Sequence, residues 1–138
     1  MKRQRMMIRV VLVVSLIMTL AAAAPVAGAE TGAVSIARLE ICADVQDREP
    51  VWVASAFTAD TAMVYCFLEA RDIAEDTTVS FVWFHGDDEV ARVPVRLGQS
   101  SRWRTYSSKK LGGRIGDWRV EVQDAQNTVL GAVDFSVE

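Results

Sequence analysis

Apolar and polar residues alternate along most of the second half of the chain, and this period of two is typical of half-buried β-strands. Val79, Phe81 and Trp83 show the pattern, and Trp118 and Val120 repeat it. Short strands separated by turn residues account for nearly all of the chain beyond residue 32. The predicted strands span residues 33–42, 51–57, 63–68, 79–84, 90–95, 102–107, 118–123 and 133–137.

Two of these segments depart from simple alternation. In residues 33–42 the apolar positions shift phase by one between Ile36 and Leu39, which predicts a β-bulge. Residues 63–68 read Met-Val-Tyr-Cys-Phe-Leu without interruption, as expected for a strand that is buried on both faces.

The spacing of strands and turns predicts the fold class. Residues 85–88 and 124–127 have the Gly, Asp and Asn content of hairpin turns. About eight short strands without an amphipathic helix between them indicate an all-β protein, an antiparallel β-sandwich of immunoglobulin-like type. A closed β-barrel is the alternative, because periodicity does not separate the two.

The first 29 residues have the three parts of a secretory signal peptide. Four basic residues lie from Lys2 to Arg9 without an acidic one, an apolar run extends from Val10 to Ala24, and residues 27–29 read Ala-Gly-Ala. We therefore expect cleavage after Ala29, which leaves residues 30–138 as a single domain in the periplasm or outside the cell. An uncleaved anchor is the alternative, because residues 10–29 reach the length that a bilayer requires.

Residues 30–138 are acidic. They keep all 18 acidic residues and 11 of the 15 basic residues, so their net charge is −7. A domain with this charge is not expected to bind nucleic acid. Its content of Val, Phe and Trp is sufficient for a packed core, which argues against disorder.

Several short motifs along the chain resemble one bacterial family. Arg-Trp-Arg-Thr at 102–105 and Gly-Asp-Trp-Arg-Val-Glu at 116–121 are the most specific, and Arg-Glu-Pro at 48–50 and Trp-Phe-His at 83–85 precede them in order. With these motifs the chain resembles the bacterial domain-of-unknown-function family 2914 over nearly all of residues 30–138. Two positions depart from the family pattern: Phe81 replaces a common His, and Asn127 replaces a common turn Gly.

This resemblance implies an envelope-facing domain and supplies no catalytic residues. Relatives often carry membrane segments or a helix-turn-helix part, and the present chain is expected to be a free-standing, secreted copy. The departure at Phe81 weakens any role built on that His, whereas Asn127 still accepts a left-handed backbone.

Candidate catalytic chemistry is poor in this sequence. His85, the single His, lies at a predicted turn beside acidic residues and is expected to be solvated rather than to bind a metal. Cys66 lies in the apolar middle of a strand, where a thiol is inert. The acids from Glu69 to Asp76 are expected to solvate a loop rather than to form a glycosidase pair. No phosphate-binding loop or dinucleotide motif occurs, so we expect no enzyme, no cofactor and no metal.

Charge is distributed unevenly within the domain. Seven basic residues fall between Arg92 and Arg114 with no acidic residue among them, whereas residues 30–91 contain 13 acidic and three basic residues. Arginines beside aromatic residues are suited to phosphate and carboxylate groups. The sequence therefore predicts an anion-binding face made of Arg102, Trp103, Arg104, Tyr106, Lys109 and Lys110. Alternatively, these arginines pair with the acidic first half of the domain across the sheet faces.

Two cysteines remain after residue 29. An even number in an oxidising compartment predicts a disulfide between Cys42 and Cys66. Two buried free thiols are the alternative.

Together these features predict a non-catalytic interaction module of the bacterial envelope. Its expected partner is another envelope protein, recognised through an apolar patch or a free sheet edge. An anionic glycan or lipid head group, recognised through a basic groove, is the alternative. An enzyme would require a deep pocket that holds His85 with other polar groups.

Overall fold

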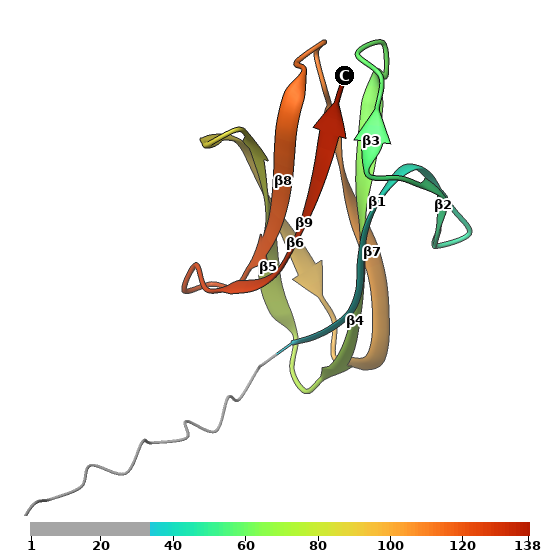
Figure 1. Ribbon diagram of the computed structural model, residues 1–138. Helices are drawn as coiled ribbons and strands as arrows, with labels where there is room; N and C mark the ends of the chain where they lie inside the picture. The colour runs from blue at the N-terminus through green and yellow to red at the C-terminus, as the bar shows by residue number, and fades with distance from the viewer. Residues whose placement is uncertain (1–33) are drawn as a thin grey trace, which may run out of the picture.

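The computed structural model describes residues 34–138, which form nine β-strands in two sheets (Figure 1). The predicted signal peptide, residues 1–29, and its cleavage site lie outside the described residues. In the part of the chain that is described, no helix is long and apolar enough to cross a membrane.

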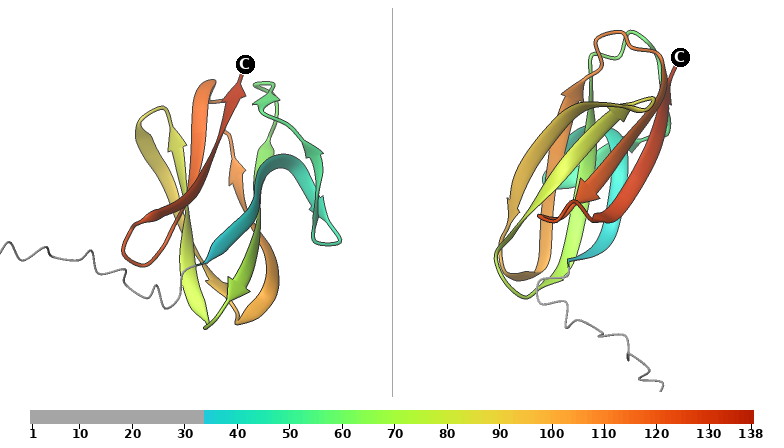
Figure 2. Two further views of the ribbon diagram at one scale, coloured as in Figure 1. Left: turned by 60° about the horizontal axis from the view of Figure 1, so that its bottom comes forward. Right: turned by 90° about the vertical axis from the view of Figure 1, so that its left-hand side faces the viewer.

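The two sheets face one another as the layers of a β-sandwich (Figure 2). The four-stranded sheet has the order β2-β1-β4-β7, and the five-stranded sheet has the order β3-β9-β8-β5-β6. This confirms the predicted all-β sandwich and rules out the closed barrel. The strands are β1 (Ser35–Gln46), β2 (Glu49–Val53), β3 (Ala56–Phe57), β4 (Met63–Ile73), β5 (Thr77–His85), β6 (Asp88–Leu97), β7 (Ser100–Lys110), β8 (Gly116–Gln123) and β9 (Val129–Val137).

The segment predicted as one strand over residues 51–57 is two strands that belong to different sheets. The N–H of Ala54 still donates to the carbonyl of Ile41 in the four-stranded sheet, whereas the carbonyl of the following residue, Ser55, accepts from Ser136 in the five-stranded sheet. The chain therefore crosses between the layers at this point. β3 then runs parallel to β9, the single parallel pairing among the described strands.

The predicted irregularities of the backbone are confirmed. The register of β1 against β4 shifts between Ile36 and Arg38, where the apolar phase changes. Gly86 in the β5–β6 hairpin has φ 59° and Asn127 between β8 and β9 has φ 62°. Both turns thus use residues that adopt the left-handed conformation at low cost.

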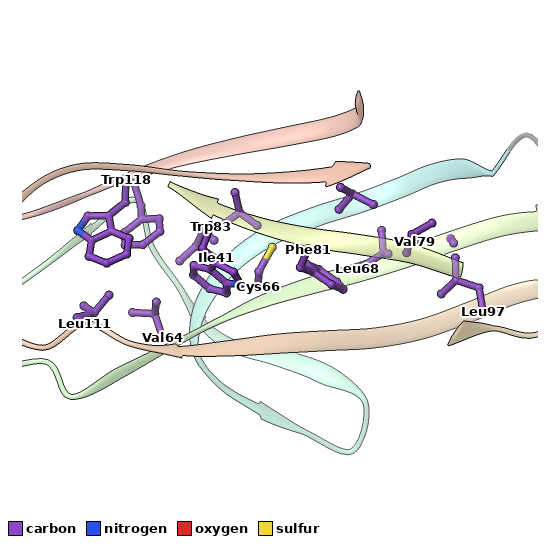
Figure 3. Close-up of a cluster of buried hydrophobic side chains, with 14 of the residues drawn as sticks. Ile41, Val64, Cys66, Leu68, Val79, Phe81, Trp83, Leu97, Leu111 and Trp118 are labelled. Atoms are coloured by element: carbon purple, nitrogen blue, oxygen red, sulfur yellow. The ribbon is translucent and has the colours of Figure 1, made fainter. Parts of the chain in front are cut away.

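The core lies between the sheets and contains the largest apolar side chains (Figure 3). Trp83 and Trp118 are fully buried there, and Trp118 stacks on Phe135 with 5.7 Å between ring centroids. The Nε1–H of Trp83 donates to the hydroxyl of Ser107 over 3.2 Å, so its polar group is satisfied. Strand β4 is buried on both faces as predicted, with Phe67 on the side opposite the core residues Val64, Cys66 and Leu68.

The disulfide predicted between Cys42 and Cys66 is wrong for this structure, in which both cysteines are free and buried. The two strands that carry them, β1 and β4, are neighbours as expected. A disulfide would require such neighbouring strands, but Cys66 is paired with Ile41 and Cys42 with Tyr65. Adjacent residues of a strand point to opposite faces, so the Cys66 thiol enters the core while that of Cys42 lies on the outer face. Burial raises the pKa of both thiols.

Candidate interaction site

All six residues predicted to bind an anion lie on β7, at one edge of the four-stranded sheet. Arg104 is paired with Glu69 of β4, and Tyr106 with Phe67. Because cross-strand partners share a face, the side chains of Arg102, Arg104 and Tyr106 lie on the outer face of the sheet. Trp103 points the other way, against Gly98, and Lys109 and Lys110 end the strand.

Arg102 is paired with a carboxylate of the protein itself. Its guanidinium lies 2.7 Å from the carboxylate of Glu69, which Arg71 also contacts at 3.0 Å. The hydrogen bond from Arg102 is the main cause that lowers the pKa of Glu69. The expectation that Glu69 solvates a loop is therefore wrong, because its side chain is buried within strand β4 and forms ion pairs.

Arg104 is also paired internally, with Glu49 at the beginning of β2. Glu49 forms a second ion pair with Arg38 at 3.0 Å. The hydrogen bonds from both arginines lower the pKa of Glu49, and the bond from Arg38 contributes most. Strand β4 lies between β1 and β7. Glu49 must therefore reach across the outer face of β4, and the strong curl of β1 in Figure 2 (left) brings the β1–β2 hairpin to this position.

Four of the seven basic residues from Arg92 to Arg114 form ion pairs inside the domain. Arg92 pairs with Glu89 and Arg96 with Asp76, in addition to the two pairs on β7. The arginines therefore meet the acidic first half of the chain, as the alternative prediction proposed. Within residues 34–138, Lys109, Lys110 and Arg114 form no ion pair. Binding of an external anion by β7 stays a prediction.

A pocket of about 240 Å³ lies on this outer face, between the β1–β2 hairpin and β7. Phe67 is buried beneath it, and the guanidinium of Arg38 lies 5.0 Å from the centroid of the Phe67 ring. Arg48, at the tip of the hairpin, and Arg104 of β7 both line it. The lining residues are Val45, Arg48, Phe67, Arg104, Thr105 and Tyr106.

The sequence prediction assigned Arg104 and Tyr106 to the site but missed Arg48 and Phe67. Arg48 is the first residue of the Arg-Glu-Pro motif that contributed to the family resemblance, so a signal was present. Its place opposite β7 depends on the curl of β1 and could not be read from spacing.

The backbone of β7 is open on the side away from β4. The N–H of Arg102 donates to the hydroxyl of Ser100 over 3.1 Å, and this hydroxyl donates to the Arg102 carbonyl over 2.6 Å. Both groups of Arg102 therefore point away from β4. Antiparallel strands direct the backbone groups of alternate residues to alternate sides. The groups of Arg104, Tyr106 and Ser108 consequently face the same open side, where no described strand is paired.

The other three sheet edges among the described residues are short or interrupted. β2 has five residues and contains Pro50, and β3 has two residues. β6 carries Pro94 in its middle, which has no N–H to donate. β7 has eleven residues and no Pro. It therefore lacks the proline that natural proteins commonly use to prevent strand pairing at an edge.

His85 is less solvated than predicted for a hairpin tip. Its Nε2 lies 2.7 Å from the carbonyl oxygen of Ile115, and its ring centroid lies 4.8 Å from that of Trp118. His85 lines neither the pocket above nor a second one formed by Ser55, Asp117 and residues 134–136. Within residues 34–138, no three His, Cys, Asp or Glu side chains are placed to hold a metal ion.

One protein-family model matches the second half of the chain. The family model described as "Protein of unknown function (DUF2914)" matches residues 76–137. The chain resembles this family. The match spans β5 to β9, so it includes all of β7 but neither Arg48 nor Phe67. It is shorter than the nearly complete match expected from the motifs. No curated protein sequence matches the chain.

Among solved structures, similar chains include three beta-glucosidases. A mutant enzyme from Listeria innocua in complex with laminaribiose has a TM-score of 0.49 at 10% identity over 77% of this chain. The enzymes from Kluyveromyces marxianus and Thermotoga neapolitana have TM-scores of 0.45 and 0.47 at 11% and 8% identity, each over 76% of this chain. The present chain covers 16%, 14% and 16% of these three chains, respectively.

Proposed function

We propose that this protein is a non-catalytic interaction module of the bacterial envelope that binds a partner protein by strand addition at β7. The observation that carries the proposal is the open edge of this strand, where the backbone groups of Arg104, Tyr106 and Ser108 have no described strand beside them. An extended segment added to such an edge gains main-chain hydrogen bonds for affinity and side-chain contacts for specificity. The envelope location rests on the predicted signal peptide.

Charge supports an acidic partner strand. Among its eleven residues β7 carries no acidic side chain, and two of its basic ones, Lys109 and Lys110, form no ion pair within residues 34–138. A second copy of β7 has no acidic side chain to place opposite these lysines, so self-pairing gains no charge complementarity. A strand that carries Glu or Asp would instead meet complementary charge.

Exposed apolar residues elsewhere also support a protein partner. The side chain of Trp52 on β2 is 73% exposed, and that of Val53 is 55% exposed. Aromatic residues of this kind are enriched where protein interfaces concentrate their binding energy.

Binding of an anionic glycan or lipid head group through β7 is the second candidate. Lys109, Lys110 and Arg114, near the end of β7, form no ion pair within the described residues and favour it. The experiment below separates the two candidates.

The test uses ten-residue peptides that alternate Glu with Val, Thr or Tyr, and measures binding by fluorescence anisotropy at low salt. Ser108→Pro removes an N–H on the open side of β7, whereas Ser108→Ala removes the same hydroxyl and keeps the N–H. We expect Ser108→Pro to weaken binding at least tenfold and Ser108→Ala to change it less than twofold, with unchanged circular dichroism for both. The proposal fails if both variants bind as the unmodified protein does. It also fails if no acidic peptide binds while an anionic polysaccharide does.

A further inference from the structure

We infer that the pocket between the β1–β2 hairpin and β7 receives a carboxylate side chain of the added strand, and that Arg48 binds this carboxylate. The inference rests on the proposed strand addition at β7. It assigns a role to Arg48 and names the chemistry that the partner must carry at one position.

The position of the pocket connects it to the open edge. Arg104 and Tyr106 line the pocket with their side chains, and the same two residues direct their backbone groups to the open side of β7. Side chains of an added strand alternate between the two faces of the sheet, and those opposite each other on a strand pair lie about 5 Å apart. The outer-face side chains of a strand paired with β7 therefore lie beside Arg104 and Tyr106, at the rim of the pocket.

The residues around the pocket leave one positive charge without an ion-pair partner. Two arginines line it, Arg48 and Arg104. Arg104 is already paired with Glu49, whereas Arg48 forms no ion pair with any residue in the range 34–138. One positive charge thus remains without a partner, which a single carboxylate would match. A bidentate contact from Arg would also fix its orientation.

The turn of the β1–β2 hairpin fixes the backbone conformation at Arg48. Asp47 and Arg48 have φ of 51° and 61°, between the paired residues Gln46 and Glu49. Positive φ at both central residues is the geometry of a tight two-residue hairpin turn. Glu49, the next residue, fastens the hairpin to Arg38 and Arg104. The backbone at Arg48 is therefore fixed before a ligand binds, which leaves only the side chain to be ordered.

The size and floor of the pocket suit a side chain better than a large ligand. Its volume of about 240 Å³ is below the range of roughly 300–1,000 Å³ that is typical for pockets holding drug-sized molecules. The buried ring of Phe67 lies at its base, with the Arg38 guanidinium 5.0 Å from the ring centroid.

The experiment pairs each Glu-containing peptide with one in which a single outer-face Glu is replaced by Gln. Binding is measured to the unmodified protein and to three variants: Arg48→Asn, Lys110→Ala and Ser108→Pro. Asn keeps the left-handed turn accessible and removes the charge. Lys110→Ala removes a basic residue from β7 that does not line the pocket.

We expect Arg48→Asn to weaken binding of the Glu peptide about tenfold and to leave binding of the Gln peptide unchanged. The loss of Glu-peptide binding should be larger for Arg48→Asn than for Lys110→Ala. Equal losses from Arg48→Asn for both peptides, or equal losses from Arg48→Asn and Lys110→Ala, would overturn the inference. If Ser108→Pro abolishes binding and Arg48→Asn does not, strand addition stands and the role of Arg48 fails. If neither Ser108→Pro nor Arg48→Asn weakens peptide binding, both strand addition at β7 and the role of Arg48 fail. Binding of free glucuronate that depends on Arg48 but not on the Ser108 N–H would instead assign the pocket to an acidic sugar.

Discussion

Arg102 and Glu69 form an ion pair with 2.7 Å between the guanidinium and the carboxylate, and the Glu69 side chain is only 2% exposed. A carboxylate that has lost its water must be paired or be protonated. Arg71 supplies the second partner. The pair therefore connects β4, in the middle of the sheet, with the edge strand β7, and keeps Glu69 charged.

Glu69→Gln should destabilise the protein by about 2 kcal/mol, because the ion pairs with Arg71 and Arg102 are lost. The loss is no larger because the two guanidinium groups that remain are partly exposed to water. Urea unfolding followed by tryptophan fluorescence measures the change. Glu75→Gln is the matched control, since Glu75 is exposed and forms no ion pair among residues 34–138. Equal stability of the two variants would contradict the role of Glu69.

Stability should fall with pH on the acidic side. The pKa of Glu69 is lowered by its hydrogen bond from Arg102, that of Glu49 by the bond from Arg38, and that of Asp76 by the backbone N–H of Gln99. A lowered pKa in the folded state stabilises the fold above the unfolded pKa, and this stability is lost as the pH falls through the folded value. The loss should therefore begin near pH 4.5, the ordinary value for Glu, and increase below it. Unfolding free energies at pH 7, 5, 4 and 3 test this, and Glu69→Gln should show a smaller loss.

Both cysteines should titrate as free thiols. Under denaturing, non-reducing conditions a thiol reagent is expected to label Cys42 and Cys66, because their side chains lie on opposite faces of the sheet. In the folded protein neither should react at pH 7, since both are buried and their pKa is raised. Recovery of unlabelled protein after denaturation would show that a disulfide forms after all.

Much of the fold can be predicted from the local pattern of apolar and polar residues, and the errors of that prediction have a common cause. The alternation of apolar and polar residues predicts where the strands lie, and the phase change after Ile36 predicts the bulge. Residues 51–57 were predicted as one strand because their alternation continues across Ala54, where the chain changes sheets. The choice of sheet depends on long-range pairing, which a local pattern does not contain. The Cys42–Cys66 pairing failed for a related reason, because a register offset of one residue reverses a side chain's face.

The candidate site shows the same division. Basic residues on 102–110 were found from sequence, but their partners Glu49 and Glu69 come from strands far along the chain. Glu69 looked like a loop residue because it follows the apolar run 63–68, whereas β4 continues to Ile73. That β7 is an edge strand follows only from the strand order.

The protein should be monomeric in the absence of a partner. Self-pairing of β7 would place no acidic side chain beside Lys109 and Lys110 of either copy, so it gains no charge complementarity and these lysines oppose association at low salt. Sedimentation velocity of residues 30–138 at 20 and 200 µM, in low and moderate salt, measures this. A dimer that Ser108→Pro dissociates would contradict the charge argument and identify a second copy as the occupant of the edge.

Amide hydrogen exchange along β7, followed by NMR, tests the central claim most directly. In the free protein the amides of Arg104, Tyr106 and Ser108 should exchange rapidly, whereas those of Thr105 and Ser107, which face β4, should be protected. Saturation with an acidic strand peptide should slow the first three amides and leave the other two unchanged. Protection of Arg104, Tyr106 and Ser108 in the free protein, or unchanged exchange of all three when the peptide is bound, would contradict strand addition at β7.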